Sequence, residues 1–389
     1  MIDQAFPPFR HSPSQPKVHV LAGAFALTLI VLLTGTLTAN CEVAAPATSR
    51  PPRIEEQWKD KLNANTVAII AGSPEDTYLD ITHDLAVVLN GENLRILPIV
   101  GMGGAQNIRD VLYLRGVDMG ITSTQMLRYF ASTGELSSAL DQRLTYITRL
   151  YPEEMHVVAG RGIKSLQDLN GKKVNFSETG SSTQITARDV FGLLSINVEE
   201  VNMSQNDAIV AIKDGSIAAT VDFSGKPAGV LAHIPAADNL HLVEVPYTHT
   251  LENIYQPGTL EQSLYPGLVD AGRQRIQTVA VDSVLITNNW QVGSERYRRV
   301  ANFVEALFTH FPDLKKPPRH PKWQEVDLGK ELPGWQRFQA AQDWLLQAKF
   351  DQFRAKYQGD NVKSESPADK QRMFREFLEW QQSEARKQR

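Results

Sequence analysis

Short apolar segments alternate with helical patterns between about residues 65 and 310, and few folds accommodate that order. The first unit is the apolar run Thr66–Ile70, a Gly-Ser-Pro turn, and an amphipathic pattern that ends near Leu89. Runs of about five residues between helices predict an α/β fold with mostly parallel sheets. The further predicted strands are 94–100, 117–122, 145–151, 155–159, 173–176, 217–223, 241–245 and 279–287.

Small and polar residues follow four of these predicted strands, in the segments Gly72–Tyr78, Gly101–Gly104, Thr122–Gln125 and Ser177–Thr183. In open α/β sheets, ligands bind beyond the carboxyl ends of the strands. The last segment opens a predicted helix, and the free N–H groups of a helix N-terminus attract anions. A turn or an N-cap would explain any one of these segments taken alone, but four together favour a ligand pocket.

Charge and composition exclude several classes of protein. The 389 residues include 40 Lys and Arg against 44 Asp and Glu, a net charge of −4. Nucleic-acid-binding domains usually have a basic stripe or a pI above about 9, whereas the pI here is about 6.2. The hydrophobic fraction of 42% excludes wholesale disorder. Because Cys41 is the one cysteine and no His or carboxylate pair has metal-ligand spacing, we predict no disulfide, no metal site and no cofactor.

The N-terminal region indicates export. The segment Val18–Ala39 lacks Asp, Glu, Lys and Arg and is long enough to span about 30 Å of hydrocarbon. Arg10 and Lys17 precede it, so the positive-inside rule predicts an exported remainder. We predict a signal anchor or signal peptide at 1–41, with an uncleaved anchor favoured over cleavage, and a stalk at 42–62. Lipidation of Cys41, or cleavage after the small residues that follow it, is the alternative.

Several motifs in a fixed order resemble the TAXI family of solute-binding proteins, the receptors of one class of TRAP transporters. The resemblance extends from about Val67 to Trp344 and includes the Gly-Ser-Ser-Thr sequence of Gly180–Thr183, where relatives usually have Gly-Ser-Gly-Thr. Its other matching stretches are Asn93–Gly101, Val111–Gly120, Ile163–Val174, Gly225–Pro227 and Gly293–Val300.

This resemblance implies a type II periplasmic-binding-protein fold, in which two α/β lobes are joined by crossover strands and close on a small ligand. The crossings are then expected near Leu150–Met155 and Val245–Thr250. The expected parts are lobe 1 at 63–151 and 247–312, lobe 2 at 152–246, and a linker with a C-terminal helical extension at 313–389. The implied ligand is a small organic anion such as glutamate or 2-oxoglutarate, and the implied partners are the membrane subunits of a TRAP transporter at the periplasmic face of the inner membrane.

The resemblance also implies the ligand-binding residues, by position along the chain. From lobe 1 they are Ser73, Thr77, Tyr78, Gly103, Gly104, Asn107, Ser123, Thr124 and Gln125. From lobe 2 they are Gly180, Ser181, Ser182, Thr183 and Asp222. The chain departs from the family at Thr122–Gln125, where relatives have Val-Gln-Ser-Asp, and at Met102–Gly104, where close relatives have Lys-Gly-Ser. The architecture is therefore expected, and the ligand is left open.

Two other functions fit parts of the sequence. An enzyme on the same two-lobed fold is disfavoured, because the chain has no Gly-x-Ser-x-Gly, His-Glu-x-x-His or Walker A motif. A tethered sensor, which would present its ligand to a membrane signalling protein, needs the same closing receptor and is not distinguished by sequence.

The last 70 or so residues form a separate part. Prolines make Lys315–Pro321 an extended connector, and aromatic residues then recur at helical spacing from Trp335 to Tyr357. A second amphipathic pattern covers Phe374–Trp380. A helical cap on lobe 1 is favoured over a partner-binding surface.

Overall fold

The computed structural model describes residues 53–91, 93–358 and 371–380. The predicted membrane segment at 18–39 and Cys41 lie outside these residues. No helix within the described ranges combines the length and the apolar character needed to cross a bilayer.

Strands and helices alternate along most of the described chain. The strands are β1 Thr66–Ile70, β2 Arg95–Ile99, β3 Met119–Ser123, β4 Leu144–Gly160, β5 Lys173–Asn175, β6 Glu199–Val201, β7 Ala219–Ser224, β8 Leu240–Leu242, β9 Gln256–Glu261 and β10 Arg275–Asn288. The α-helices are α1 Ile54–Ala64, α2 Thr77–Leu89, α3 Gly104–Tyr113, α4 Thr124–Thr133, α5 Leu140–Arg143, α6 Ser182–Leu193, α7 Gln205–Lys213, α8 Gly229–Ala232, α9 Glu295–Thr309, α10 Phe311–Leu314 and α11 Gln339–Gln358. Three 3₁₀ turns are η1 Leu166–Leu169, η2 Ala236–Asp238 and η3 Pro321–Glu325, and residues 371–380 are helical.

One mixed sheet connects these strands in the order β2-β1-β3-β10-β4-β7-β5-β6, with β8 beside β4 and β9 beside β10. The strands β1, β2 and β3 are parallel, as are β5, β6 and β7. The central pairs β3–β10, β10–β4 and β4–β7 are antiparallel. The prediction of mostly parallel sheets is therefore wrong at the centre, because β4 and β10 run in opposite directions there.

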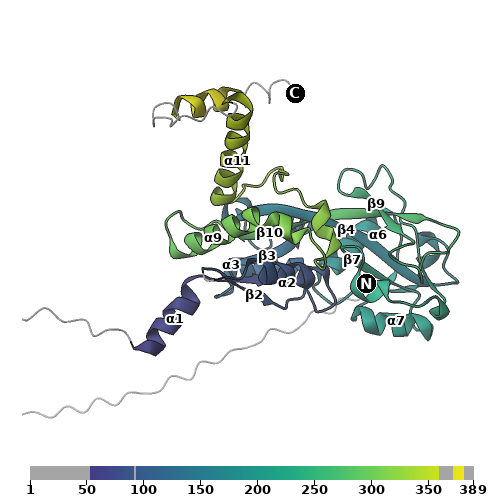
Figure 1. The fold of residues 1–389 in the computed structure, drawn as a ribbon. Helices are drawn as coiled ribbons and strands as arrows, with labels where there is room; N and C mark the ends of the chain where they lie inside the picture. The colour runs from purple at the N-terminus through teal and green to yellow at the C-terminus, as the bar shows by residue number, and fades with distance from the viewer. Residues whose placement is uncertain (1–52, 92, 359–370, 381–389) are drawn as a thin grey trace, which may run out of the picture. The chain divides into compact units, whose positions relative to one another are not determined.

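The long strands β4 and β10 connect two halves of the molecule. In Figure 1 they run between the part with α2, α3 and α9 and the part with α6 and α7. We call the part around β1–β3 the first half and the part around β5–β7 the second half. Each half has its own apolar core: Ile69 and Phe303 belong to a first-half cluster, whereas Val174 and Phe191 belong to a second-half cluster.

The two crossings between the halves differ in how well the sequence predicts them. The first falls within β4, as expected, because Leu150 packs in the first-half core and Met155 in the second-half core. The second does not lie near residues 245–250. Leu251 still packs in the second-half core, and the chain returns within β10, where Val281 belongs to the second half and Val284 to the first. Lobe 2 therefore extends well beyond 246.

The segments that flank the two halves also differ from expectation. Ile54–Ala64, part of the predicted stalk, forms the helix α1, none of whose residues is buried. The proline-rich connector ends in a 3₁₀ turn that begins at Pro321. The C-terminal helix α11 starts by packing on the first half, since the rings of Trp344 and Phe308 on α9 meet edge to face with centroids 5.1 Å apart.

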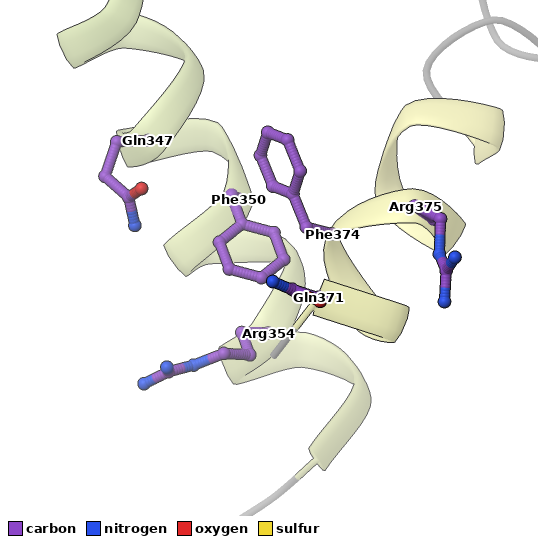
Figure 2. A pocket seen from close by; sticks show the side chains of 6 residues that line it. All are labelled: Gln347, Phe350, Arg354, Gln371, Phe374 and Arg375. Carbon is purple, nitrogen blue, oxygen red and sulfur yellow. The ribbon is translucent and has the colours of Figure 1, made fainter. Parts of the chain in front are cut away.

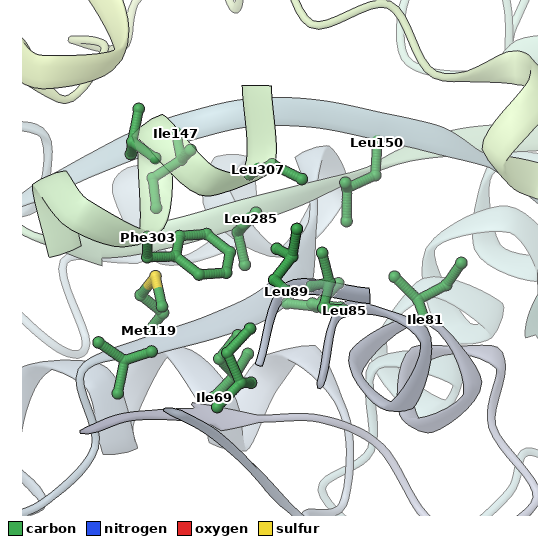
Figure 3. Packing of buried hydrophobic residues seen from close by; sticks show 14 of the residues in the cluster. Ile69, Ile81, Leu85, Leu89, Met119, Ile147, Leu150, Leu285, Phe303 and Leu307 are labelled. Carbon is green, nitrogen blue, oxygen red and sulfur yellow. The ribbon is translucent and has the colours of Figure 1, made fainter. Parts of the chain in front are cut away.

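Figure 3 shows the first-half core, where Phe303 of α9 lies among Ile69, Met119 and Leu285 from three neighbouring strands. We expect Phe303→Ala to lower the free energy of unfolding by about 3–5 kcal/mol, because it removes a fully buried ring and leaves a cavity. Val87→Ala on the exposed face of α2 should change it by less than about 0.5 kcal/mol. Urea denaturation measures both, and equal effects would contradict the assigned core.

Candidate functional site

Loops at the carboxyl ends of strands from the two halves contact one another directly. The Thr77 hydroxyl lies 2.9 Å from the Ser224 hydroxyl, across the two halves. The backbone N–H of Ala105 at the start of α3 donates to Ser182 Oγ at the start of α6 over 3.2 Å. Gln125 Nε2 donates to a carboxylate oxygen of Asp189 at 2.7 Å. We call this contact zone the interface between the halves.

The close approach of α3 and α6 depends on glycines. Gly103 precedes α3 with a φ of +103°, a conformation that side chains disfavour. A Cβ on Gly104 would lie 2.7 Å from Thr122 Oγ1 and 2.9 Å from Ser182 Oγ, closer than atoms can pack. These two positions therefore need glycine for the interface to form as it does.

Side chains of the loops cap the helices that start at the interface. Asp76 accepts from the Tyr78 N–H at the start of α2, and Ser123 accepts from the Met126 N–H at the start of α4. Ser181 accepts from the Gln184 N–H at the start of α6. Each cap uses an N–H group that would otherwise be available to an anion.

Three acidic side chains act on one another at the interface: Asp76 from the segment after β1, Glu153 from β4, and Asp222 from β7. We call them the carboxyl cluster. The side chain of Glu153 is almost fully buried, whereas Asp76 and Asp222 are partly buried. None of the three forms an ion pair with Lys, Arg or His among the residues that the structure describes.

Polar atoms without partners lie beside the cluster. The hydroxyl oxygens of Tyr78 and Tyr151 and the Oε1 of Glu153 are buried and make no hydrogen bond of ordinary geometry. All three side chains are at least 97% buried, since their exposed fractions are 3%, 0% and 2%. A buried polar group without a partner costs about 1–3 kcal/mol, so this is an unusual concentration of unmet hydrogen-bonding capacity.

The pKa values of the cluster follow from burial and like charge. Burial raises the pKa of Asp222 to about 8, and the charges of Asp76 and Glu178 raise it further. Burial likewise raises the pKa of Asp76 to about 7, against the hydrogen bond from Tyr78 N–H. The pKa of Glu153 is raised well above its usual range by burial and by Asp76 and Asp222, although the Tyr78 hydroxyl beside it opposes this.

Basic groups near the interface are already paired with other acids. Lys322 is fully buried and its Nζ lies 2.7 Å from Glu154 Oε1, while Lys226 Nζ lies 3.7 Å from the same oxygen. His156 does not supply a charge either, because burial lowers its pKa to about 3 and Lys322 lowers it further. The carboxyl cluster therefore keeps its negative charge unbalanced when its groups ionise.

Most of the fourteen sequence-predicted residues lie at or next to the interface. Thr77, Gly103, Gly104, Gln125 and Ser182 take part in its contacts. Tyr78 and Asp222 lie at the carboxyl cluster. The binding role of all fourteen remains a prediction.

The other predicted residues serve the local fold. Ser123 and Ser181 are the caps already described, and the Thr183 hydroxyl accepts from Phe223 N–H. Asn107 Nδ2 donates to the carbonyl of Ile121 at 2.6 Å and so supports the end of β3. The remaining three fill the loops: Ser73 accepts through its carbonyl from Asp76 N–H, Thr124 opens α4, and the Gly180 N–H donates to Gln184 Oε1.

The sequence analysis does not include Tyr151 and Glu153 as site residues, whereas Asp76 lies within the predicted pocket segment Gly72–Tyr78. A signal for Glu153 was present, because Glu153 and Glu154 interrupt the otherwise apolar predicted strands on either side of them. Because successive side chains of a strand point to opposite faces, adjacent acids in a strand meet different surroundings.

A second hollow lies away from the interface, between α11 and the helix at 371–380. Figure 2 shows Phe350 and Phe374 facing each other across it, with centroids 5.3 Å apart. Gln347, Arg354, Gln371 and Arg375 complete its lining. No group of three or more His, Cys, Asp or Glu side chains in the described ranges is arranged to hold a metal ion.

Comparison with known proteins gives one family. The model of the NMT1-like family matches residues 69–332, more than half of the chain, and the chain belongs to this family. Solved structures similar to this chain include "Structure of a periplasmic transporter", at 14% identity and a TM-score of 0.46, covering 77% of this chain and 98% of that one.

Two further structures are similar at a comparable level. The aliphatic sulphonate binding protein SsuA from Escherichia coli matches at 14% identity and a TM-score of 0.40, with 66% and 76% of the two chains covered. Tv2483 bound to L-arginine matches at 11% identity and a TM-score of 0.42, with 71% and 98% covered.

The carboxyl cluster predicts how stability depends on pH without ligand. An ordinary aspartate loses its proton near pH 4, whereas folded Asp222 holds it to about pH 8. Between these values the folded state binds more protons than the unfolded state, so the free energy of unfolding should fall as pH rises from 5 to 9. Asp222→Asn should flatten that slope in urea titrations, and Asp270→Asn, an exposed acid, should not. A wild-type slope that rises with pH would contradict the assignment.

Proposed function

We propose that the chain is a solute-binding receptor whose two halves close on a small polar solute at their interface. The observation that supports this most directly is the group of buried, unpartnered polar atoms on Tyr78, Tyr151 and Glu153, at the meeting of loops from both halves. A rigid structural core would satisfy these groups. In a receptor, such groups form hydrogen bonds with the bound ligand instead.

The topology supports closure. The chain passes from the first half to the second in β4 and returns in β10, so two paired strands can bend as a hinge while each half keeps its own core. The contacts between the halves include hydrogen bonds of Thr77, Gln125 and Ser182 and an ion pair of Arg128 with Asp189, beside the apolar contact of Ile185. Such contacts break at little cost when the interface opens in water.

The receptor's place in the cell follows from the sequence rather than from the fold. We propose that it is exported through the N-terminal segment, acts at the periplasmic face of the inner membrane, and passes its solute to the membrane subunits of a TRAP-type transporter, as the TAXI-like motifs suggest. A sensor subunit of a membrane signalling protein is the second candidate. An enzyme is a weaker one, since the sequence has no Gly-x-Ser-x-Gly, His-Glu-x-x-His or Walker A motif and the described residues include no group of three metal-ligating side chains.

The sequence predicts an anionic solute, but the acidic side chains at the interface disfavour one. A carboxylate placed there would face Asp76, Glu153 and Asp222 without a basic residue to balance it. The charge of the solute is therefore a separate question from the receptor function.

A double variant tests the receptor function. Thr77→Val with Ser182→Ala removes hydrogen bonds between the halves, each worth about 0.5–1.5 kcal/mol, and should weaken solute binding about tenfold with little change in the melting temperature of the ligand-free protein. Ser132→Ala, an exposed serine on α4, is the matched control. The assay is a thermal-shift screen of the full chain against small amines, amino acids and carboxylates, followed by calorimetry.

Two results decide the matter. At least one compound should raise the melting temperature of the wild type and of Ser132→Ala, and less so that of the double variant. If no compound in the three classes raises it, or if the double variant binds as tightly as the wild type, the closing receptor is contradicted.

A further inference from the structure

We propose that the carboxyl cluster binds the charged nitrogen of a small organic cation, a primary ammonium group on an aliphatic chain. This rests on the proposed receptor function and assigns its ligand a charge class opposite to that implied by the family resemblance. Three features of the interface support this proposal: the charges that lie there, the donors that already have partners, and the acceptors that have none.

The charges at the interface are of one sign. Asp76, Glu153 and Asp222 come from three separate elements. Asp76 and Asp222 raise the pKa of Glu153, and Asp76, Glu178 and Glu75 raise the pKa of Asp222. Folding brings these groups together against their mutual repulsion. An ammonium among them would remove that repulsion and supply three donors to carboxylate oxygens.

The acceptors left over suit the same ligand. Oε1 of Glu153 has no partner, and the hydroxyl oxygens of Tyr78 and Tyr151 have free lone pairs in the same buried region. An ammonium group donates and never accepts, so it matches the Glu153 oxygen and the hydroxyl lone pairs, while the Tyr78 O–H donates to Glu153 beside it. The two tyrosine rings add apolar and electron-rich surface for the chain that carries the nitrogen.

Several backbone N–H groups at the helix starts, which an anion would need as donors, are already engaged. At the start of α6, Ser181 Oγ accepts a hydrogen bond from the Gln184 N–H, and Gln184 Oε1 accepts one from the Gly180 N–H. At the start of α3, Ser182 Oγ holds the Ala105 N–H. At the start of α2, the Tyr78 N–H donates to the Asp76 carboxylate. This carboxylate occupies the position that an anionic ligand would need. Four N–H groups at these helix starts therefore already have acceptors within the protein.

The basic side chains of the protein near the cluster do not occupy the position proposed for the ammonium group. Lys322 and Lys226 are bound to Glu154, the neighbour of Glu153 in β4, and His156 is neutral at physiological pH. A metal ion is a poorer occupant, since the described side chains include no group of three ligands at metal-binding geometry.

The ionisable groups that face the cluster set its pH dependence. They are Glu75, Asp76, Tyr78 and Asp80 from the segment after β1 and from α2, Tyr151, Glu153, Glu154 and His156 from β4, Glu178 from the segment before α6, Asp207 from α7, and Asp222 from β7. Asp76 and Asp222, with pKa values of about 7 and about 8, lose charge as pH falls from 8.5 to 6.0. An aliphatic ammonium, with a pKa near 10, stays charged over the same range.

A matched pair of probes separates the two ligand charges. 1,4-Diaminobutane and succinate have four-carbon chains of opposite charge, and each is titrated into the full chain by calorimetry at pH 6.0 and pH 8.5. We expect the diamine to bind at pH 8.5 and to bind at least tenfold more weakly at pH 6.0, where the cluster takes up protons. Succinate should not bind at either pH.

Two variants connect the binding to the cluster. Asp76→Asn keeps the cap of α2, because Asn caps as well as Asp, and Asp222→Asn keeps the shape of its side chain. Each should weaken diamine binding at least tenfold at pH 8.5, with a melting temperature equal to or above that of the wild type. Asp270→Asn, an exposed acid in the second half, should bind the diamine as the wild type does.

The outcomes distinguish this proposal from the receptor function. Succinate binding that strengthens at pH 6.0, without diamine binding, would overturn the cation proposal and assign the protonated carboxyl groups as donors to an anion. If the diamine fails but another compound binds and loses affinity in the Thr77→Val, Ser182→Ala variant, the receptor stands and the cation proposal falls. If nothing binds, both fall. Equal diamine binding by wild type and Asp222→Asn would also overturn the cation site.

Discussion

Two adjacent residues in the strand that joins the halves, Glu153 and Glu154, meet opposite electrostatic surroundings, and the character of the interface depends on this difference. Successive side chains of a strand point to opposite faces. Glu154 meets the buried Lys322 and also Lys226, which ties β4 to the C-terminal segment and to the second half. Glu153 instead meets Asp76 and Asp222. Burial of a paired carboxylate is tolerated, whereas burial of an unpaired group among like charges is costly and calls for an external partner.

The N-termini of the helices at the interface also differ from a typical anion site. Polar loops at strand ends that open a helix are often taken as anion sites because their N–H groups are free. Here the hydroxyl of Ser182 and the carboxylate of Asp76 occupy such groups, so the loops hold the halves together and cap their own helices. The same residues therefore support closure of the receptor without determining what it binds. The acidic side chains Glu153 and Asp222 come instead from β4 and β7.

Much of the fold could be predicted from the sequence, and the reasons are local. The run Thr66–Ile70 is apolar, short and followed by a turn, so strand β1 has the predicted bounds. The return crossing could not be predicted, because nothing in residues 247–274 shows that they pack on the second-half core rather than the first. Glu153 could not be predicted for a related reason: adjacent acids in a strand point to opposite faces, and only the packing shows which of them pairs with Lys322.

The ionisable groups of the carboxyl cluster have no basic partner among the described residues. Carbon-13 NMR of labelled aspartate carboxyl groups in the ligand-free protein measures this directly, with Asp76→Asn and Asp222→Asn to assign the signals. Two resonances should titrate with midpoints near pH 7 and pH 8, well separated from the exposed aspartates. Midpoints near pH 4 for both groups would show that the charges are balanced or solvated, and would contradict the account.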